Sequence, residues 1–210
     1  MNKSILCVFV KYPEPGKVKT RLGEQIGMKN AAKAYQGMVE YFVHSLKVER
    51  LPFILYFTPV CREDDFQKWL GRDLNYLPQV GDNLGQKLVY GFQRLYQKGF
   101  SRVMAIGSDT PTLPMDYLQW GLDFLGKSPM VIGPTLDGGY YLIGFQNASF
   151  TPVVFSNIPW STREVFSNTL EKCRKLGIFP EILPYWRDVD YADEWERVRP
   201  IVERFQEDSS

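Results

Sequence analysis

Residues 5–22 read Ile-Leu-Cys-Val-Phe-Val-Lys-Tyr-Pro-Glu-Pro-Gly-Lys-Val-Lys-Thr-Arg-Leu, an apolar run joined directly to a basic loop. The unbroken, partly β-branched run Ile5–Val10 is typical of a strand that is buried on both faces of a parallel sheet. Pro13 and Pro15 each restrict a φ angle, and Gly16 permits conformations closed to other residues, so the loop is pre-shaped. Ligands of open α/β sheets bind where strands end, which makes this loop the first candidate for a binding site.

Strand-like and helix-like segments alternate along the rest of the chain. Apolar, β-rich runs predict strands at residues 53–57, 75–79, 102–106, 130–132, 140–145 and 179–183. Helical spacing and capping residues predict helices at residues 29–47, 63–70, 83–98, 114–125, 162–175 and 192–205. This alternation indicates an α/β fold with a mostly parallel central sheet and helices on both faces. Because no repeat or linker interrupts it, we expect residues 1–210 to form a single domain with a frayed tail at about residues 206–210.

The bulk composition excludes several classes of protein. The 210 residues are 44% hydrophobic and 15% aromatic, which is a globular and not a disordered composition. The formal net charge of +1 gives no global attraction to nucleic acid or to an acidic membrane surface. The three cysteines are far apart, so neither a zinc site nor a disulfide framework is expected. The first apolar run is too short for a signal peptide or a membrane span, and we therefore expect a cytoplasmic protein.

Positive charge is concentrated in the loop after the first strand, on Lys11, Lys17, Lys19 and Arg21. In an extended loop, every second side chain lies on the same face, so Lys17, Lys19 and Arg21 could converge on one phosphate chain. Arginine can hold phosphate oxygens bidentately, and lysine adds a mobile point charge. The alternative is a solvated basic loop with no ligand.

Two common kinds of chemistry are disfavoured. The loop lacks the G-x-x-x-x-G-K-[ST] spacing, and no G-x-G-x-x-G follows the first strand, so NAD and FAD are not expected. The only histidine, His44, lies in a predicted helix away from any strand end. Acyl transfer by a Ser-His-Asp or Cys-His arrangement is therefore not expected either.

A carboxylate follows the strand predicted at residues 102–106. Asp109 lies just past this strand, and Gly107 between them permits close approach of a ligand to the backbone. A Mg²⁺ ion prefers one or two carboxylates together with phosphate oxygens and water, so Asp109 is a candidate metal ligand. The alternative is a turn or a helix cap, where Asp is also common.

Three segments of the second half combine polar side chains with turn residues: Asp137-Gly138-Gly139, Trp160-Ser161-Thr162 and Asp188-Val-Asp190. The first could let a substrate approach the backbone, or could be an ordinary hairpin turn. The second precedes a predicted helix and could bind an anion or supply the N-cap. In the third, either carboxylate could reach the metal of Asp109 or could cap the last helix. Spacing alone leaves these alternatives open.

Four stretches, in order along the chain, resemble one known family. They are FVKYPEPGKVKTRL at residues 9–22, GSDTPTLP at 107–114, GPTLDGGYYLIG at 133–144 and WST at 160–162. They resemble a bacterial family of GT-A-type glycosyltransferase-like proteins, often named as candidate nucleotide-diphospho-sugar transferases, some of which accompany radical-SAM enzymes in arsenosugar-type pathways. This family is similar to the molybdenum-cofactor and phospholactate guanylyltransferases. The resemblance runs from about residue 5 to residue 192.

The resemblance implies a Rossmann-like GT-A (nucleotide-diphospho-sugar transferase) fold with a nucleotide over the first loop, Mg²⁺ or Mn²⁺ at Asp109, and a second metal contact from Asp188 or Asp190. The nucleotide-binding residues expected on this basis are Lys11, Pro15, Gly16, Lys17, Thr20, Gly85, Lys87 and Ser108. The expected substrate-binding residues are Asp137, Gly138, Gly139, Trp160, Ser161 and Thr162. The chain departs from the family pattern at residues 83–88, where an acidic residue and Arg-Met are usual, and at Tyr191, where threonine is usual.

These features predict a metal-dependent transferase that uses an activated nucleotide and a small-molecule acceptor. Lys19 and Arg21 would stabilise the charge that develops as the bond breaks, and with Asp109 they form the expected catalytic set. Glycosyl transfer from a nucleotide-diphospho-sugar is the first hypothesis. Nucleotidyl transfer with release of pyrophosphate is the close alternative, because both reactions need positioning and positive charge more than a strong base. A non-catalytic nucleotide-binding protein is the third. All three require the basic loop and Asp109 to face one cleft.

Overall fold

The computed structural model describes residues 3–208, and its central strand is β1 (Ser4–Lys11). This strand is hydrogen-bonded in parallel to β2 (Phe53–Thr58) on one side and to β4 (Arg102–Gly107) on the other, with Val8 opposite Leu55 and Ile106. Both faces of β1 are buried, which confirms the expectation of a central parallel strand at residues 5–10.

The sheet has seven strands in the order β3-β2-β1-β4-β6-β5-β7. The strands not yet placed are β3 (Tyr76–Pro78), β5 (Met130–Pro134), β6 (Tyr140–Gln146) and β7 (Glu181–Ile182). Only β6 runs antiparallel to its neighbours β4 and β5, because a short turn joins it directly to β5. The predicted α/β fold with a mostly parallel sheet is therefore confirmed.

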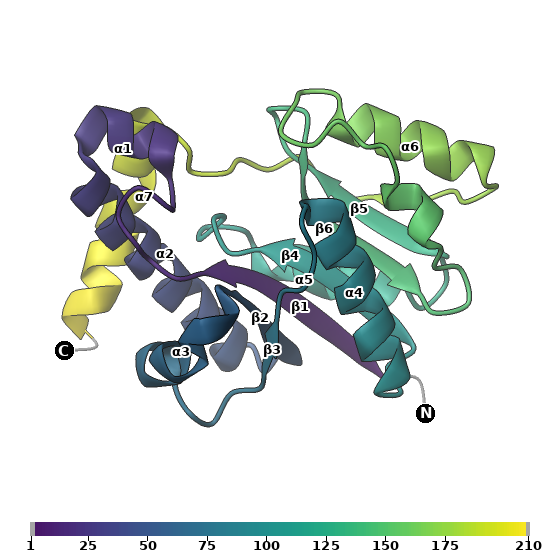
Figure 1. Cartoon of the computed structure of the whole chain (residues 1–210), viewed down its shortest axis with the longest axis horizontal. Helices are drawn as coiled ribbons and strands as arrows, with labels where there is room; N and C mark the ends of the chain where they lie inside the picture. The colour runs from purple at the N-terminus through teal and green to yellow at the C-terminus, as the bar shows by residue number, and fades with distance from the viewer. Residues whose placement is uncertain (1–2, 209–210) are drawn as a thin grey trace.

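Alternating residues of the strands divide the core into two layers, one on each face of the sheet. Leu6 and Val8 pack toward one layer, which contains α2 (Met28–Val48), α3 (Glu63–Leu70), α5 (Met115–Phe124) and α7 (Ala192–Asp208). Cys7 packs toward the other, which contains α4 (Leu84–Gln97), the short 3-10 turn η2 (Pro152–Phe155) and α6 (Val165–Lys175). In Figure 1, α2, α3 and α7 lie at the left of the view and α4 and α6 at the right. Burial on both faces is the physical reason that the strands read as continuous apolar runs.

Several element boundaries differ from the predictions. A short helix, α1 (Thr20–Ile26), follows the first loop, and a 3-10 turn, η1 (Val60–Arg62), precedes α3. The strand predicted at 179–183 shortens to β7, and the helix predicted from residue 162 begins at Val165. Helix α7 continues through Asp208, so residues 206–208 of the predicted tail are helical; residues 209–210 lie outside the described part of the chain.

The segment between β7 and α7 crosses the carboxyl ends of the strands. Figure 1 shows it running from the β5 side of the molecule to α7, which packs beside α1 and α2. The fold thereby brings residues 183–191 to the edge of the sheet at which β1 and β4 end.

Between residues 3 and 208, no helix combines the length and the apolar character that a membrane crossing requires. Cys7 and Cys173 are buried and Cys61 is exposed, and all three are free thiols.

Candidate active site

A cavity of about 920 Å³ opens at the carboxyl ends of β1 and β4. Residues from every segment singled out in the sequence line it, and the predicted site residues among them are Lys11, Lys19, Thr20, Arg21, Lys87, Ser108, Asp109, Asp137, Gly139, Trp160, Ser161, Thr162, Asp188 and Asp190. Pro15, Gly16, Lys17, Gly85 and Gly138 do not line the cavity. His44 also lies elsewhere, with its ring 4.9 Å from that of Phe205.

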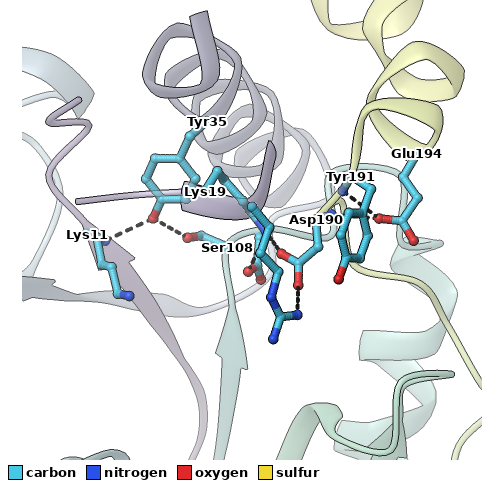
Figure 2. A network of polar contacts seen from close by, with 9 residues as sticks. Lys11, Lys19, Tyr35, Ser108, Asp190, Tyr191 and Glu194 are labelled. Atoms are coloured by element: carbon cyan, nitrogen blue, oxygen red, sulfur yellow. Dashed lines mark hydrogen bonds and ion pairs between the residues drawn. The ribbon is translucent and has the colours of Figure 1, made fainter. Parts of the chain in front are cut away.

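At the floor of the cavity, Lys19 joins two carboxylates that are remote from it in the sequence. Its Nζ donates to Oδ2 of Asp109 at 2.9 Å and to Oδ1 of Asp190 at 2.8 Å. The Lys19 side chain is only 5% exposed, whereas those of Asp109 and Asp190 are 38% and 30% exposed. Figure 2 shows Lys19 and Asp190 directed toward one another from α1 and from the segment before α7. The basic loop and the acidic strand end therefore share one cavity and are in direct contact.

The contact changes the proton affinity of both partners. Burial opposes ionisation of Asp109, but the neighbouring Lys19 ammonium outweighs it and holds the pKa of that carboxyl below its usual range. Burial likewise opposes charge on Lys19, but the carboxylates of Asp109 and Asp190 raise its pKa above the ordinary value. Both groups are consequently ionised at neutral pH.

Asp188 lies beside this pair in a different electrostatic state. Its Oδ1 atom is buried and has no hydrogen-bond partner among the described residues. Burial, and then the negative charge of Asp109, raise the pKa of Asp188 well above its usual value. A buried carboxylate oxygen without a donor is where a cation would be most stabilising.

Local backbone geometry explains which residues of the basic loop reach the cavity. Lys19 is the N-cap of α1 and has left-handed φ and ψ angles of 44° and 49°, so the chain turns there and helix begins at Thr20. The prediction that residues 17–21 form an extended loop is therefore wrong. Lys17 is exposed and lies outside the cavity, whereas Arg21, two residues after Lys19, still lines it. Pro15 and Gly16 shape the turn without lining the cavity.

Arg21 contacts the same carboxylate as Lys19. Its Nη1 lies 3.3 Å from Oδ2 of Asp190, and its guanidinium carbon is 6.0 Å from the ring centre of Tyr191. The Arg21 side chain is 52% exposed, so this ion pair is screened by solvent. The guanidinium can accordingly exchange its carboxylate for a ligand oxygen at small cost.

Tyr35, on α2, is hydrogen-bonded to the carboxyl ends of β1 and β4. Its place in the sequence did not indicate this role. Its hydroxyl accepts from the backbone N–H of Lys11 at 2.9 Å and shares a hydrogen bond with Oγ of Ser108 at 2.9 Å (Figure 2). Its position in a helical apolar pattern indicated a core residue, and 4% exposure agrees with that. Nothing in the spacing distinguished a tyrosine that also holds the site.

Gln79 was also missed. Its buried side-chain amide donates to the carbonyl of Tyr56 at 2.6 Å and to that of Val10 at 3.3 Å. A buried amide must find partners, and here they are main-chain carbonyls of β1 and β2. Gln79 thereby fixes the two strands beside the cavity that it lines.

The acidic segment before α7 is held by backbone contacts. The N–H of Val189 donates to the carbonyl of Asp109 at 3.2 Å, which ties the two acidic segments together. Oε2 of Glu194 accepts from the N–H groups of Asp190 at 2.7 Å and Tyr191 at 3.0 Å. Glu194 therefore satisfies free donors at the start of α7, and Asp190 is left to face Lys19.

The turn between β5 and β6 is an ordinary hairpin connection. The carboxylate of Asp137 accepts from Oγ1 of Thr135 at 2.5 Å and from the N–H of Gly139 at 3.1 Å. Gly138 has φ of 92° and packs against the backbone of Arg163, and it does not line the cavity. Asp137 and Gly139 still line the cavity.

Two further segments that line the cavity, at residues 83–87 and 160–162, also differ from the predictions. Asn83 caps α4 by accepting from the N–H of Gln86. Gly85 packs against the indole of Trp160. Of the two nucleotide-binding residues predicted here, Gly85 and Lys87, only Lys87 lines the cavity. Thr162 is not the N-cap of α6; its hydroxyl donates to the carbonyl of Pro159 at 2.8 Å and accepts from the N–H of Glu164 at 3.2 Å.

Residues 42–162 match the family model described as "Uncharacterized protein conserved in bacteria (DUF2064)". The chain belongs to this family. The crystal structure of a candidate nucleotide-diphospho-sugar transferase from Desulfovibrio desulfuricans G20 is 33% identical, with a TM-score of 0.87, over 98% of this chain and 99% of that chain. No functionally curated protein matches the sequence.

More distant structures share the fold of this DUF2064 protein. CMP:2-keto-3-deoxy-manno-octonic acid synthetase complexed with CTP is 12% identical, with a TM-score of 0.61 over 97% of this chain and 99% of that chain. The Rv0371c protein of Mycobacterium tuberculosis H37Rv, in complex with manganese, is 11% identical, with a TM-score of 0.53 over 94% and 98%. The fold is GT-A-like, as the resemblance implied.

Four cations line the cavity of this DUF2064 protein without an ion-pair partner among residues 3–208. Lys11 and Lys87 lie on the side of β1 and α4, and Arg163 and Arg187 lie beside the β5–β6 turn. None has a carboxylate oxygen within 4.0 Å in the described part of the chain. They are therefore free to bind an anionic ligand.

The carboxylates of Asp109, Asp188 and Asp190 suit a metal ion whose other ligands are phosphate oxygens and water. Within residues 3–208, no group of three or more His, Cys, Asp or Glu side chains is arranged to hold a metal ion. A Mg²⁺ ion, however, commonly takes only one or two protein carboxylates and completes its shell with phosphate oxygens and water. Asp109 and Asp190, with the unpartnered oxygen of Asp188 nearby, are a donor set of that kind.

Proposed function

We propose that this protein is a metal-dependent transferase acting on an activated nucleotide, with residues 1–210 working as one domain. The observation that carries the proposal is the single cavity in which the acidic centre, Asp109, Asp188 and Asp190, is flanked by the unpaired cations Lys11 and Lys87. Carboxylates for a metal and cations for phosphates are the two requirements of nucleotide chemistry. The 33% identical candidate nucleotide-diphospho-sugar transferase supports glycosyl transfer as the reaction.

In this proposal, the chain's residues divide the work by position. Lys11, at the end of β1, and Lys87, in the first turns of α4, bind the phosphate chain from two sides. Asp109 and Asp190 would hold a Mg²⁺ or Mn²⁺ ion, which would supply positive charge that neutralises the diphosphate. Lys19 and Arg21 lie next to those carboxylates, where their charges stabilise the departing nucleoside diphosphate.

The acceptor is assigned to the far side of the same cavity. Arg163 and Arg187 offer guanidinium groups there, and the indole of Trp160, which packs against Gly85 of α4, also lines the cavity. Backbone contacts hold both arginines to the β5–β6 turn: Arg163 packs against Gly138, and the residue before Arg187 exchanges hydrogen bonds with Pro134 and Leu136. This wall is therefore pre-organised for a polar small molecule.

Nucleotidyl transfer is the second candidate function. The structure in complex with CTP, although only 12% identical, shares this fold, and the same residues would suit an acceptor that attacks the α-phosphorus with loss of pyrophosphate. A non-catalytic nucleotide-binding protein is the third, and it predicts binding without turnover.

The test is thermal unfolding with a panel of nucleotides and nucleotide sugars, with and without Mg²⁺. A cognate ligand at about 100 times its dissociation constant should raise the melting temperature by about 5 °C or more. Asp109→Ala should abolish the metal-dependent part of this rise, and Asp116→Ala, an exposed carboxylate on α5, is the matched control. Melting unchanged by every nucleotide would refute the proposal, and analysis of the products for sugar or pyrophosphate release separates the two reactions.

A further inference from the structure

The Lys19 ammonium occupies the position between the two carboxylates that the proposed function assigns to the metal. It lies 2.9 Å from Asp109 and 2.8 Å from Asp190, and it is the most deeply buried cation of the site, at 5% exposure. Figure 2 shows its side chain directed toward Asp190, to which a dashed line joins it. A single side chain therefore does for these carboxylates what a bound cation would do.

We propose that Lys19 acts as a resident stand-in for the divalent cation, so that the ligand of this site is a metal–nucleotide complex and neither the free metal nor the free nucleotide. The inference rests on the proposed function and specifies the form in which its nucleotide substrate is bound. When the complex binds, the carboxylates of Asp109 and Asp190 exchange the Lys19 ammonium for the metal. The ammonium in turn exchanges these carboxylates for the phosphate oxygens.

Electrostatics disfavour entry of the metal alone. A divalent ion could reach Asp109 and Asp190 only by expelling Lys19, and the expelled ammonium would lose both carboxylates to which it is hydrogen-bonded. Separating a buried ion pair and leaving one member unpaired is strongly unfavourable. A nucleotide removes this obstacle, because its phosphate oxygens provide the new partner for Lys19 at the moment when the metal takes the old ones.

The geometry allows the exchange without refolding of the loop. The backbone of Lys19 is anchored, since its carbonyl accepts from the N–H of Gly23 at 2.8 Å at the start of α1. Its side chain has a flexible four-carbon stem and borders the cavity of about 920 Å³. Lys11 and Lys87, which line the same cavity, attract the phosphates into the reach of that stem.

The experiment measures Mn²⁺ binding by electron paramagnetic resonance in the absence of any nucleotide. Wild-type protein should bind Mn²⁺ weakly, whereas Lys19→Met should bind it at least tenfold more tightly, because the carboxylates are then free. Lys19→Arg, which keeps the cation, should stay within threefold of wild type. Lys33→Met is the matched control, since Lys33 is an exposed lysine on α2 outside the cavity, and its affinity should not change.

Equal Mn²⁺ affinities for wild type and Lys19→Met would overturn the inference, as would tight binding of Mn²⁺ alone by the wild type. If Lys19→Met does not fold without metal, circular dichroism should show that Mn²⁺ restores its folding, and a failure to restore it would count equally against the inference. Because no nucleotide is present, these outcomes are independent of the melting experiment with nucleotides that tests the proposed function.

Discussion

The ammonium of Lys19 and the carboxylate of Asp109 lie 2.9 Å apart although ninety positions separate them in the chain. Lys19 follows the loop after β1, and Asp109 follows the adjacent strand β4, so parallel pairing of these two strands brings their carboxyl ends together. Residues 183–191 then cross this edge and add Asp190 to the pair. The site exists because three chain segments end at the same place.

Two lysines of the cavity should contribute to nucleotide affinity, and a third should not. Lys11→Ala or Lys87→Ala removes a charge-assisted contact and should weaken binding by about 1.5–3 kcal/mol. Lys17→Ala should change affinity by less than about 0.5 kcal/mol, because Lys17 lies outside the cavity. Isothermal titration with the nucleotide identified by thermal unfolding measures all three. A loss for Lys17→Ala as large as for Lys87→Ala would mean that the loop rearranges on binding.

Removal of the Tyr35 hydroxyl should destabilise the fold. Tyr35→Phe leaves the N–H of Lys11 and the hydroxyl of Ser108 without this partner, which should cost about 1–3 kcal/mol of unfolding free energy. Tyr41→Phe, on the same helix, removes a hydroxyl outside the cavity and should cost less than about 0.5 kcal/mol. Urea denaturation of the two variants makes the comparison, and equal stabilities would show that the hydroxyl of Tyr35 contributes nothing.

Asp188 should make the metal-free protein less stable as pH rises. Its folded pKa is raised, so the folded state holds a proton that the unfolded state has already lost above about pH 4. Stability from this group therefore falls between about pH 4 and the folded pKa, by about 1.4 kcal/mol for each pH unit in that interval. Asp188→Asn should remove this slope and be more stable than wild type at neutral pH.

Urea denaturation in a chelating buffer from pH 5 to pH 8 tests the Asp188 prediction. Asp109 contributes the opposite slope, because its pKa is lowered and its stabilisation is lost only as pH falls below the ordinary carboxyl range. Parallel stability curves for wild type and Asp188→Asn would contradict the assignment of a raised pKa to Asp188.

Gly138 should tolerate no side chain. A Cβ atom there would overlap the carbonyl oxygen of Arg163, and φ is 92°. Gly177→Ala provides the control, because φ is 69° at that position and no atom lies within 4 Å of the added Cβ. For the control, the free energy of unfolding should fall only by the cost of a left-handed backbone, about 1–2 kcal/mol. For Gly138→Ala, it should fall by clearly more. Thermal unfolding of both variants separates the steric cost from the backbone cost.

The alternation of strands and helices could be predicted from the sequence. A strand that is buried on both faces of the sheet is a continuous run of apolar residues, which local sequence shows. The apolar runs at residues 5–10, 53–57 and 102–106 all became strands of the parallel sheet. Helix α1 was not predicted, because its seven residues are too few for a periodic pattern and Gly27 separates it from α2. Residues 179–183 shortened to β7 because they lie at the edge of the sheet, where pairing depends on β5.

The candidate site was predictable in its chemistry and not in its pairing. Lys19, Arg21, Asp109 and Asp190 were all expected to be near the nucleotide, and all four line one cavity. The expectation of cations aligned along an extended loop failed, since residues 15–17 form a turn, Lys19 is left-handed and α1 begins at Thr20. Tyr35 and Gln79 were missed because a side chain that both packs and forms hydrogen bonds has the same spacing as one that only packs.

The sequence by itself determined the α/β fold, the strand that occupies its centre and the types of side chain that reach the carboxyl ends of the strands, because apolar periodicity and turn chemistry act over a few residues. Only the tertiary structure decided which charges meet. Lys19 contacts Asp109 and Asp190 because β1 pairs with β4 and because the chain crosses the sheet before α7, and pairings between remote segments leave no trace in local spacing.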